Sequence, residues 1–202
     1  MKPDDPIYTA LYRYTKALSV ALGYRDQLTR LHSERVVKLS VAIGARYGLS
    51  EEDMGILRVA ASFHDIGKIG IPDHILLKPL PFEPAEWEIM KKHPEIGAEI
   101  MAATELEGSQ QAALVIRHHH EHFNGHGYPN GLSGEDIPIH SRIISIADGY
   151  DAMAETRAYH HSRKHSEVME ILSAETGKKY DPQLMYIFSE LIESGQHLTA
   201  KV

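Results

Sequence analysis

The chain has 202 residues, of which 43% are hydrophobic and 24% charged, so it is long enough for one self-sufficient domain and lacks the composition of a disordered protein. It contains no cysteine, which excludes disulfides and thiolate metal sites, and its formal net charge of -7 disfavours a broad surface for duplex nucleic acid. The unusual feature is the 14 histidines, because any metal here must be held by imidazole and carboxylate groups.

The N-terminus, MKPDDPIY, lacks the basic and apolar regions of a signal peptide, and no apolar run approaches the length of a membrane span. We therefore expect a cytoplasmic protein with no membrane contact. Residues 1–25 are expected to form a helical segment that packs on the core, and residues 26–202 to form the main domain.

Helical spacing of apolar residues dominates the chain. Between residues 29 and 47 they recur at intervals of three to five residues, and Gly48 follows as a signal for the end of the helix. Ser50, with Asp53 three residues later, predicts the capped start of a second helix. Ser109 and Ser166 are expected N-caps of later helices, and first helical turns are also expected at three prolines: Pro84, Pro94 and Pro182.

Patterns typical of strands are scarce, whereas residues 122–137 carry several turn signals and predict one long loop. The expected fold class is therefore all-α, a bundle of roughly seven to nine helices.

Candidate metal ligands are spread over separate helices and helix ends, as in bundles that bring side chains to an interior site. A lone buried histidine or aspartate is more often bonded to backbone than to metal, and His119 and His120 alone would leave the two interpretations equally balanced. The joint occurrence of seven such residues favours metal: His32, His64, Asp65, His93, His119, His120 and Asp148. Adjacent helical residues point about 100° apart, so the paired motifs fit two neighbouring ions better than one.

The remaining histidines are expected outside the ligand set. His118, His122 and His126 are predicted to support the site or lie in the loop, and four others are predicted at the surface: His74, His140, His165 and His197.

The sequence resembles the HD-GYP family, a subgroup of the HD-domain metal-dependent phosphohydrolases, from about Asp26 to Phe188. The matching motifs are HSERV at 32–36, HDIGKIGIPD at 64–73, KKHPEIG at 91–97, HHE at 119–121, NGHGYPNGL at 124–132, IADGYDAM at 146–153 and KKYDP at 178–182. Residues 26–202 would then be an HD-GYP catalytic domain with an HD-domain-like helical bundle and a long GYP loop.

The resemblance implies roles at individual positions. One ion would be held by His32, His64, Asp65 and Asp148, and Asp65 would bridge to a second ion held by His93, His119 and His120. Lys68 would act with Asp65 in catalysis and contact the scissile phosphate, and Arg157 would bind phosphate. Tyr128 of the GYP loop would contact substrate or a partner, or alternatively form a rigid turn over the metal pocket. Arg117 lies close enough along the chain to help neutralise phosphate.

The family's activity is hydrolysis of cyclic dinucleotides, above all cyclic di-GMP, to linear pGpG and in some members onward to GMP. Two divalent ions, iron in the first place with manganese, nickel or zinc as alternatives, would share a hydroxide that attacks phosphorus. The alternatives are a phosphodiesterase for cyclic GMP–AMP dinucleotides and a module of low activity that acts by protein–protein interaction. Expected partners are the substrate, a diguanylate cyclase (GGDEF) or other regulatory protein, and a second copy of the chain.

Four departures from the family pattern bear on these expectations. Leu28 stands where some members have a glutamate ligand, so two metals are expected rather than three. Residues 78–81, Lys-Pro-Leu-Pro, lack the glycine usual in that loop, which should stiffen or redirect it. Asn124 replaces the usual aspartate and keeps the turn chemistry. His160 and His161 stand where a basic residue is common, so phosphate affinity should depend on pH.

Overall fold

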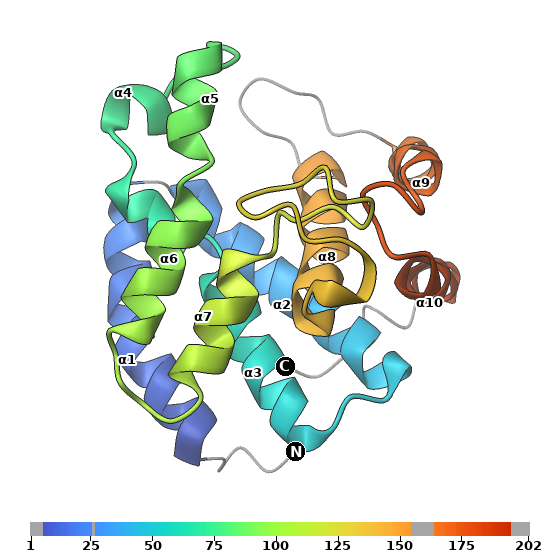
Figure 1. Cartoon of the computed structure of the whole chain (residues 1–202), viewed down its shortest axis with the longest axis horizontal. Helices are drawn as coiled ribbons and strands as arrows, with labels where there is room; N and C mark the ends of the chain where they lie inside the picture. Colours follow the sequence, from blue (N-terminus) through green and yellow to red (C-terminus); the bar gives the residue numbers. More distant parts are fainter. Residues whose placement is uncertain (1–5, 26, 155–163, 195–202) are drawn as a thin grey trace.

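The computed structural model describes residues 6–25, 27–154 and 164–194, and within these ranges it contains α-helices and two short 3-10 helices but no β-strand (Figure 1). This confirms the all-α class. The ten α-helical segments include one single turn, α4, which leaves nine longer helices in the described part of the chain. Their bounds are α1 Pro6–Arg25, α2 Gln27–Tyr47, α3 Glu51–Phe63, α4 Asp73–Leu76, α5 Pro84–Met90, α6 His93–Ala102, α7 Ser109–Arg117, α8 Ile139–Ala154, α9 His165–Ala174 and α10 Pro182–Glu193; the 3-10 helices are η1 Ile66–Gly70 and η2 Gly134–Asp136.

Local sequence signals explain where several helices begin and end. Gly48 has a φ of 93°, a left-handed conformation that ends α2. The Ser50 hydroxyl accepts a hydrogen bond from the Asp53 backbone N–H at 3.1 Å, which caps α3 as predicted. The predicted caps of α7 and α9 are wrong by one or two residues, because Gly108 and Lys164 occupy the N-cap positions and both serines lie inside their helices.

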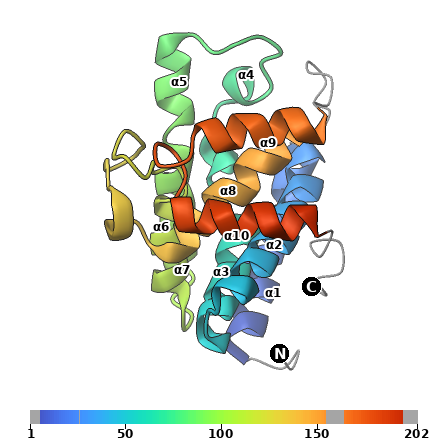
Figure 2. The same ribbon diagram turned by 90° about the vertical axis from the view of Figure 1, so that its right-hand side faces the viewer.

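The central helices α2, α3, α7 and α8 pack against one another around an aliphatic core, which includes Ile43, Leu57, Ile116 and Ile144. Helix α6 packs along α7, and α9 and α10 lie across α8 and α2 on another side (Figure 2). Burial of these aliphatic side chains is the main stabilising contribution to the bundle. The helix ends at the middle of the bundle are thereby held in fixed positions.

A close contact between η1 and α6 depends on Gly67. A Cβ at this position would lie 1.9 Å from the His93 carbonyl oxygen and 2.5 Å from the Gly97 nitrogen. Only glycine allows the two backbones to approach this closely. The contact brings Asp65, which precedes η1, and Lys68, in the middle of η1, near His93 at the start of α6.

Helix α1 packs on α2, α3 and η1, so the N-terminal segment covers one side of the bundle in its described part. The division of the chain at residue 26 stays a prediction. No helix in the described ranges has the length and hydropathy needed to cross a membrane.

Candidate metal centre

The predicted ligands meet at the middle of the bundle, although they are as far apart as residues 32 and 148. His32 lies in α2 and Asp148 in α8, whereas the others stand at helix ends: His64 and Asp65 directly follow α3, His93 begins α6, and His119 and His120 follow α7. Of the seven, all but His120 and Asp148 are buried.

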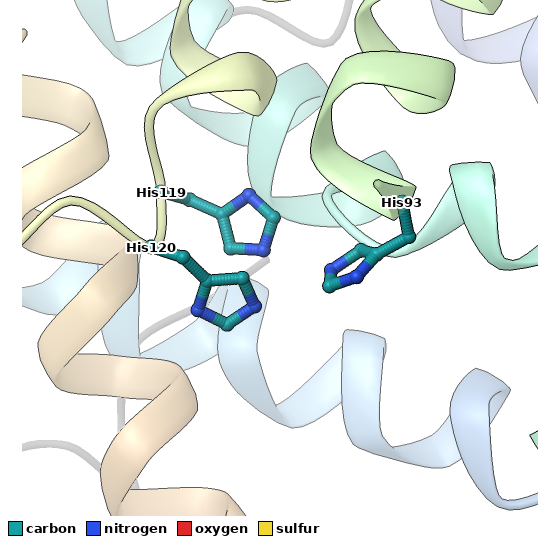
Figure 3. A group of neighbouring side chains, drawn as sticks. All are labelled: His93, His119 and His120. Carbon is teal, nitrogen blue, oxygen red and sulfur yellow. The ribbon is translucent and has the colours of Figure 1, made fainter. Parts of the chain in front are cut away.

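These side chains form two groups of three. His93, His119 and His120 each offer a ring nitrogen, and these atoms lie within 4.8 Å of one another (Figure 3). The second group is His32, His64 and Asp148, which meets the same limit.

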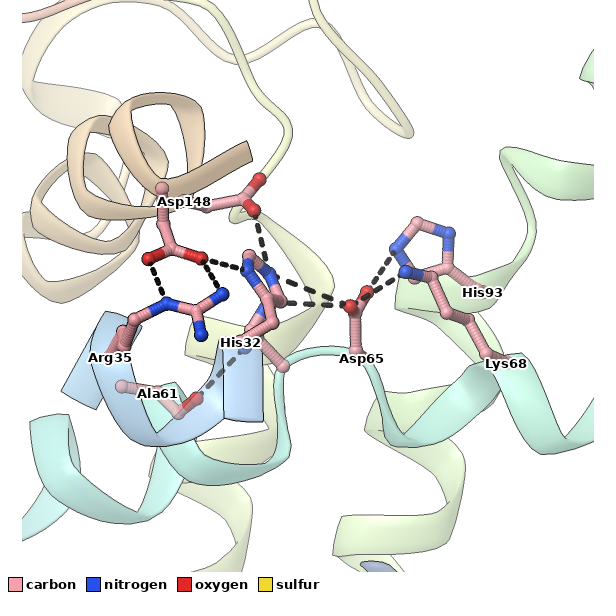
Figure 4. Close-up of polar contacts among 9 residues, drawn as sticks. His32, Arg35, Ala61, Asp65, Lys68, His93 and Asp148 are labelled. Carbon is pink, nitrogen blue, oxygen red and sulfur yellow. Dashed lines mark hydrogen bonds and ion pairs between the residues drawn. The ribbon is translucent and has the colours of Figure 1, made fainter. Parts of the chain in front are cut away.

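Asp65 lies between the two groups (Figure 4). Its Oδ1 is 3.5 Å from His93 Nε2 in the first group, and its Oδ2 is 3.6 Å from His64 Nε2 and 3.9 Å from His32 Nε2 in the second. One carboxylate therefore faces both groups, one oxygen toward each, as a bridging ligand would.

Three of the imidazoles are fixed by carbonyl groups at the ends of helices. His64, His93 and His119 place Nδ1 at 2.8, 2.8 and 2.6 Å from the carbonyls of Ala61, Met90 and Ile116, each in the last turn of a helix. These carbonyls lack a helical partner and can only accept, so Nδ1 carries the proton. Nε2 is then an unprotonated lone-pair donor aimed at the centre.

The three Nε2 atoms are buried and have no hydrogen-bond partner within the described protein. Burial lowers the pKa of His93 to about 4 and that of His119 to about 3, so both imidazoles are neutral at physiological pH. Buried polar atoms without partners are costly, and a metal ion would satisfy them. The donors are imidazole nitrogen and carboxylate oxygen, a set that suits iron, manganese, nickel or zinc.

His32 is oriented by Asp151, a residue that the sequence analysis did not identify. Its Nδ1 lies 2.7 Å from Asp151 Oδ2, and Arg35 holds the same carboxylate through Nε at 2.6 Å and Nη2 at 3.0 Å. Carboxylates commonly orient metal-binding histidines in this way. The available signal was spacing, since Asp151 and Arg35 each lie three residues, one helical turn, beyond a predicted ligand.

The charge state of His32 follows from its two carboxylate neighbours. Burial lowers its pKa, but hydrogen bonds to Asp148, 3.1 Å from Nε2, and to Asp151 outweigh burial and raise the pKa to about 9. A metal at Nε2 would therefore displace a proton.

The carboxylates of the centre are ionised. Burial alone would raise the pKa of Asp65, but Lys68, with Nζ 2.7 Å from Oδ2, and the surrounding imidazoles lower it well below its usual value. Burial is likewise outweighed at Asp148, whose pKa is lowered well below its usual value chiefly by His32.

The predicted loop at residues 122–137 is confirmed, and it places Tyr128 beside the first group. The Tyr128 ring lies 5.0 Å from the His120 ring at an interplanar angle of 32°, and the Tyr128 N–H donates to the His120 carbonyl. A Cβ at Gly127 would lie 2.2 Å from the His122 nitrogen, so glycine is needed for the loop to lie this close. Burial and nearby carboxylates raise the pKa of Tyr128, which keeps its hydroxyl protonated.

Arg117 is engaged by other protein groups. Its Nη2 lies 2.6 Å from Glu95 Oε1, and its Nε donates to the Asn130 side-chain oxygen at 3.2 Å. Contact with a phosphate would compete with these bonds, so the phosphate role of Arg117 stays a prediction. Arg157 lies outside the described residues, as do His160, His161 and His197.

Two other histidines, His118 and His140, are less exposed to solvent than surface or loop residues usually are. His118 is buried, with Nδ1 3.4 Å from Glu121 Oε1, in line with a supporting role. The surface prediction is wrong for His140, whose side chain is 12% exposed and faces Asp53 at 3.4 Å, because helix α8 turns it toward α3.

Comparison with known proteins places these features in a family. A model of the HD domain matches residues 16–184. The chain is 39% identical over 166 residues to the cyclic di-GMP phosphodiesterase response regulator RpfG of Xanthomonas campestris, covering 82% of this chain and 44% of that protein. It is 40% identical over 181 residues to a cyclic di-GMP phosphodiesterase of Thermotoga maritima, covering 90% and 49%. It is 38% identical over 173 residues to the 3'3'-cGAMP-specific phosphodiesterase 2 of Vibrio cholerae, covering 86% and 33%.

The chain thus spans less than half the length of these relatives. Among solved structures, a protein of Bdellovibrio bacteriovorus described as an HDG"Y"P protein aligns with a TM-score of 0.66 at 20% identity, over 92% of this chain and 62% of that one. This similarity confirms the predicted HD-domain-like bundle.

Proposed function

Because the chain belongs to the HD-domain family, within its HD-GYP group, we propose that it is a metal-dependent phosphodiesterase that hydrolyses cyclic dinucleotides, with cyclic di-GMP as the leading substrate. The observation that carries the proposal is the pair of ligand groups with Asp65 between them. Inward lone pairs and ionised carboxylates suit such a centre to two divalent cations rather than to general acid–base catalysis alone.

The proposed ligands are His32, His64 and Asp148 for one ion and His93, His119 and His120 for the other, with Asp65 shared. Two bound divalent ions would supply Lewis acidity toward the phosphate and lower the pKa of an attacking water. The chain keeps the donors in place through helix-end carbonyls and through Asp151, so little reorganisation is needed when metal binds.

Lys68 is proposed to bind the scissile phosphate. Its Nζ touches Asp65 while its side chain is 20% exposed, so the ammonium lies at the edge of the centre and faces both the protein and the solvent side. A phosphodiester gains negative charge as water adds to phosphorus, and a fixed ammonium stabilises that charge. Tyr128 is proposed to contact the nucleotide, and Arg157 a phosphate.

A mixed GMP–AMP cyclic dinucleotide is a second candidate substrate, because a relative of similar identity is named as specific for 3'3'-cGAMP. The metal centre acts on phosphate and does not distinguish the two. Discrimination between guanine and adenine must come from groups that contact the bases.

The test is to incubate metal-reconstituted protein with cyclic di-GMP and with 3'3'-cGAMP, under iron(II) or manganese(II), and to separate the products by chromatography. We expect linear pGpG from cyclic di-GMP, with GMP as a later product if the second bond is also cut. Asp65→Asn should lose activity with both substrates, whereas Glu190→Gln, which alters an exposed side chain of α10, should retain it. Absence of linear product with both substrates and both metals would refute the proposal.

A further inference from the structure

The chain's single tryptophan, Trp87, lies next to the proposed metal centre and is not explained by it. Trp87 belongs to α5, which projects with α4 from one end of the bundle (Figure 1). The residue is 42% exposed, so part of its indole faces the solvent.

A series of rings connects Trp87 with the first ligand group. The indole meets the Tyr128 ring edge-on, at 6.2 Å between centroids and 82°, and Tyr128 in turn lies 5.0 Å from the ring of His120. The distance between the centroids of the indole and the His120 ring is therefore at most the sum of these two centroid distances. A base joined through ribose to a phosphate at the metal centre would reach this surface.

The Trp87 indole is held in place by neighbouring residues of α5 and of the loop before it. Phe82 stacks on it at 6.1 Å and 18°, and the loop before α5 is fixed by the ion pair of Lys78 with Glu86, 2.6 Å apart. A rigid, partly exposed aromatic face suits stacking, because its orientation is set before the ligand binds. The Lys91 Nζ lies 5.9 Å from the Tyr128 centroid and is paired with Glu88 Oε1 at 2.7 Å, so both charges of this pair lie beside the same rings.

We propose that the exposed part of the Trp87 indole, which stands nearly perpendicular to the Tyr128 ring, stacks against one purine of the cyclic dinucleotide. This inference rests on the proposed function and assigns Trp87 a role in substrate binding, through contact with the base. Stacking accepts guanine and adenine alike, since both present a π-face, so Trp87 contributes affinity and leaves the choice of base to other residues.

Steady-state kinetics with cyclic di-GMP test the role of the indole. Trp87→Leu keeps an apolar side chain but removes the π-face, and we expect KM to rise roughly 5- to 150-fold, the range that base–aromatic stacking supplies, with kcat little changed. Trp87→Phe should restore most of the affinity. Tyr186→Leu, which alters an aromatic residue that is 65% exposed on α10, is the matched control and should leave KM unchanged. Circular dichroism melts show whether the variants are folded.

Fluorescence gives a second readout that does not depend on turnover, because the emission reports on Trp87 alone when tyrosine is not excited. On rapid mixing of the metal-loaded wild-type protein with cyclic di-GMP, we expect quenching before product forms. Inorganic phosphate, which has no base, should not quench.

The outcomes separate this inference from the proposed function. Linear product formed with no quenching, or with a wild-type KM in folded Trp87→Leu, would overturn the stacking role and leave the phosphodiesterase proposal intact. Equal quenching by phosphate would also overturn it. Absence of both binding and hydrolysis would overturn both proposals.

Discussion

The contact between Asp151 and His32 yields a quantitative prediction about metal affinity. Asp151→Asn keeps the shape of the side chain but removes the charge that faces His32 Nδ1 at 2.7 Å and Arg35 Nε at 2.6 Å. The variant imidazole would lose the negative partner that orients it and makes it a stronger electron donor. The ion held by His32, His64 and Asp148 should therefore bind more weakly.

The size of the effect follows from two opposing contributions. Outer carboxylates that orient metal-binding histidines contribute roughly 10- to 100-fold to metal affinity. Part of this contribution is offset, because Asp151 together with Asp148 also raises the pKa of His32 to about 9, and a metal at Nε2 must displace the proton held there. We therefore expect the lower end of the range, a roughly tenfold loss of affinity.

The assay is competition for manganese between the protein and a fluorescent chelator, with Glu190→Gln as the control that removes an exposed carboxylate of α10. We expect one of two binding steps to weaken in Asp151→Asn, while the second keeps its wild-type affinity. Wild-type affinity at both steps would refute the role assigned to Asp151. Equal weakening at both would indicate a general loss of structure instead.

Three further predictions concern catalysis, packing and pH. Lys68→Met should lower kcat roughly 100-fold while the protein keeps its metal, measured by product chromatography and metal analysis. Gly67→Ala should destabilise the fold by about 3 kcal/mol in urea denaturation, because its Cβ would collide with backbone, against about 1 kcal/mol for Gly48→Ala, whose Cβ meets nothing within 4 Å. The metal-free protein should be most stable near pH 6.5. Below this pH, the unfolded chain protonates two histidines, His93 and His119, whose pKa values are lowered to about 4 and about 3 in the folded chain, so stability falls by about 3 kcal/mol per pH unit. Above this pH, the stability that comes from the raised pKa of His32 is lost as the pH rises through about 9. Unchanged hydrolysis in Lys68→Met would contradict the phosphate role of Lys68. Equal loss of stability in the two glycine variants would contradict the packing argument, and stability that is flat between pH 4 and 6.5 would contradict the argument from the histidine pKa values.

The helical class and the long loop could be predicted from the sequence because both depend on local patterns, namely apolar spacing and turn residues. The seven candidate ligands could be named because each lies in a short sequence motif and the motifs follow one another in the order typical of the family. Their convergence could not be derived from spacing alone, since it depends on how α2, α3, α6, α7 and α8 pack.

Residues that act through others were harder to find. Asp151 was missed because its spacing from Asp148 indicates only a shared helix face, and its contact with His32 is visible only when α8 packs against α2. The sequence also did not point to Trp87, because its proposed role depends on contacts with Phe82 and Tyr128 that form only in the folded chain. The helix-end carbonyls that fix His64, His93 and His119 are backbone groups, which side-chain motifs do not reveal.

The central claim is that two ligand groups sharing Asp65 hold two ions that act together. The most direct test is to count metal ions per chain by elemental analysis while measuring hydrolysis of cyclic di-GMP as metal is added to metal-free protein. We predict two ions per wild-type chain, with hydrolysis appearing only as the second ion binds, and one ion without hydrolysis in His93→Ala. Full activity with one ion per chain, or in His93→Ala, would contradict the account.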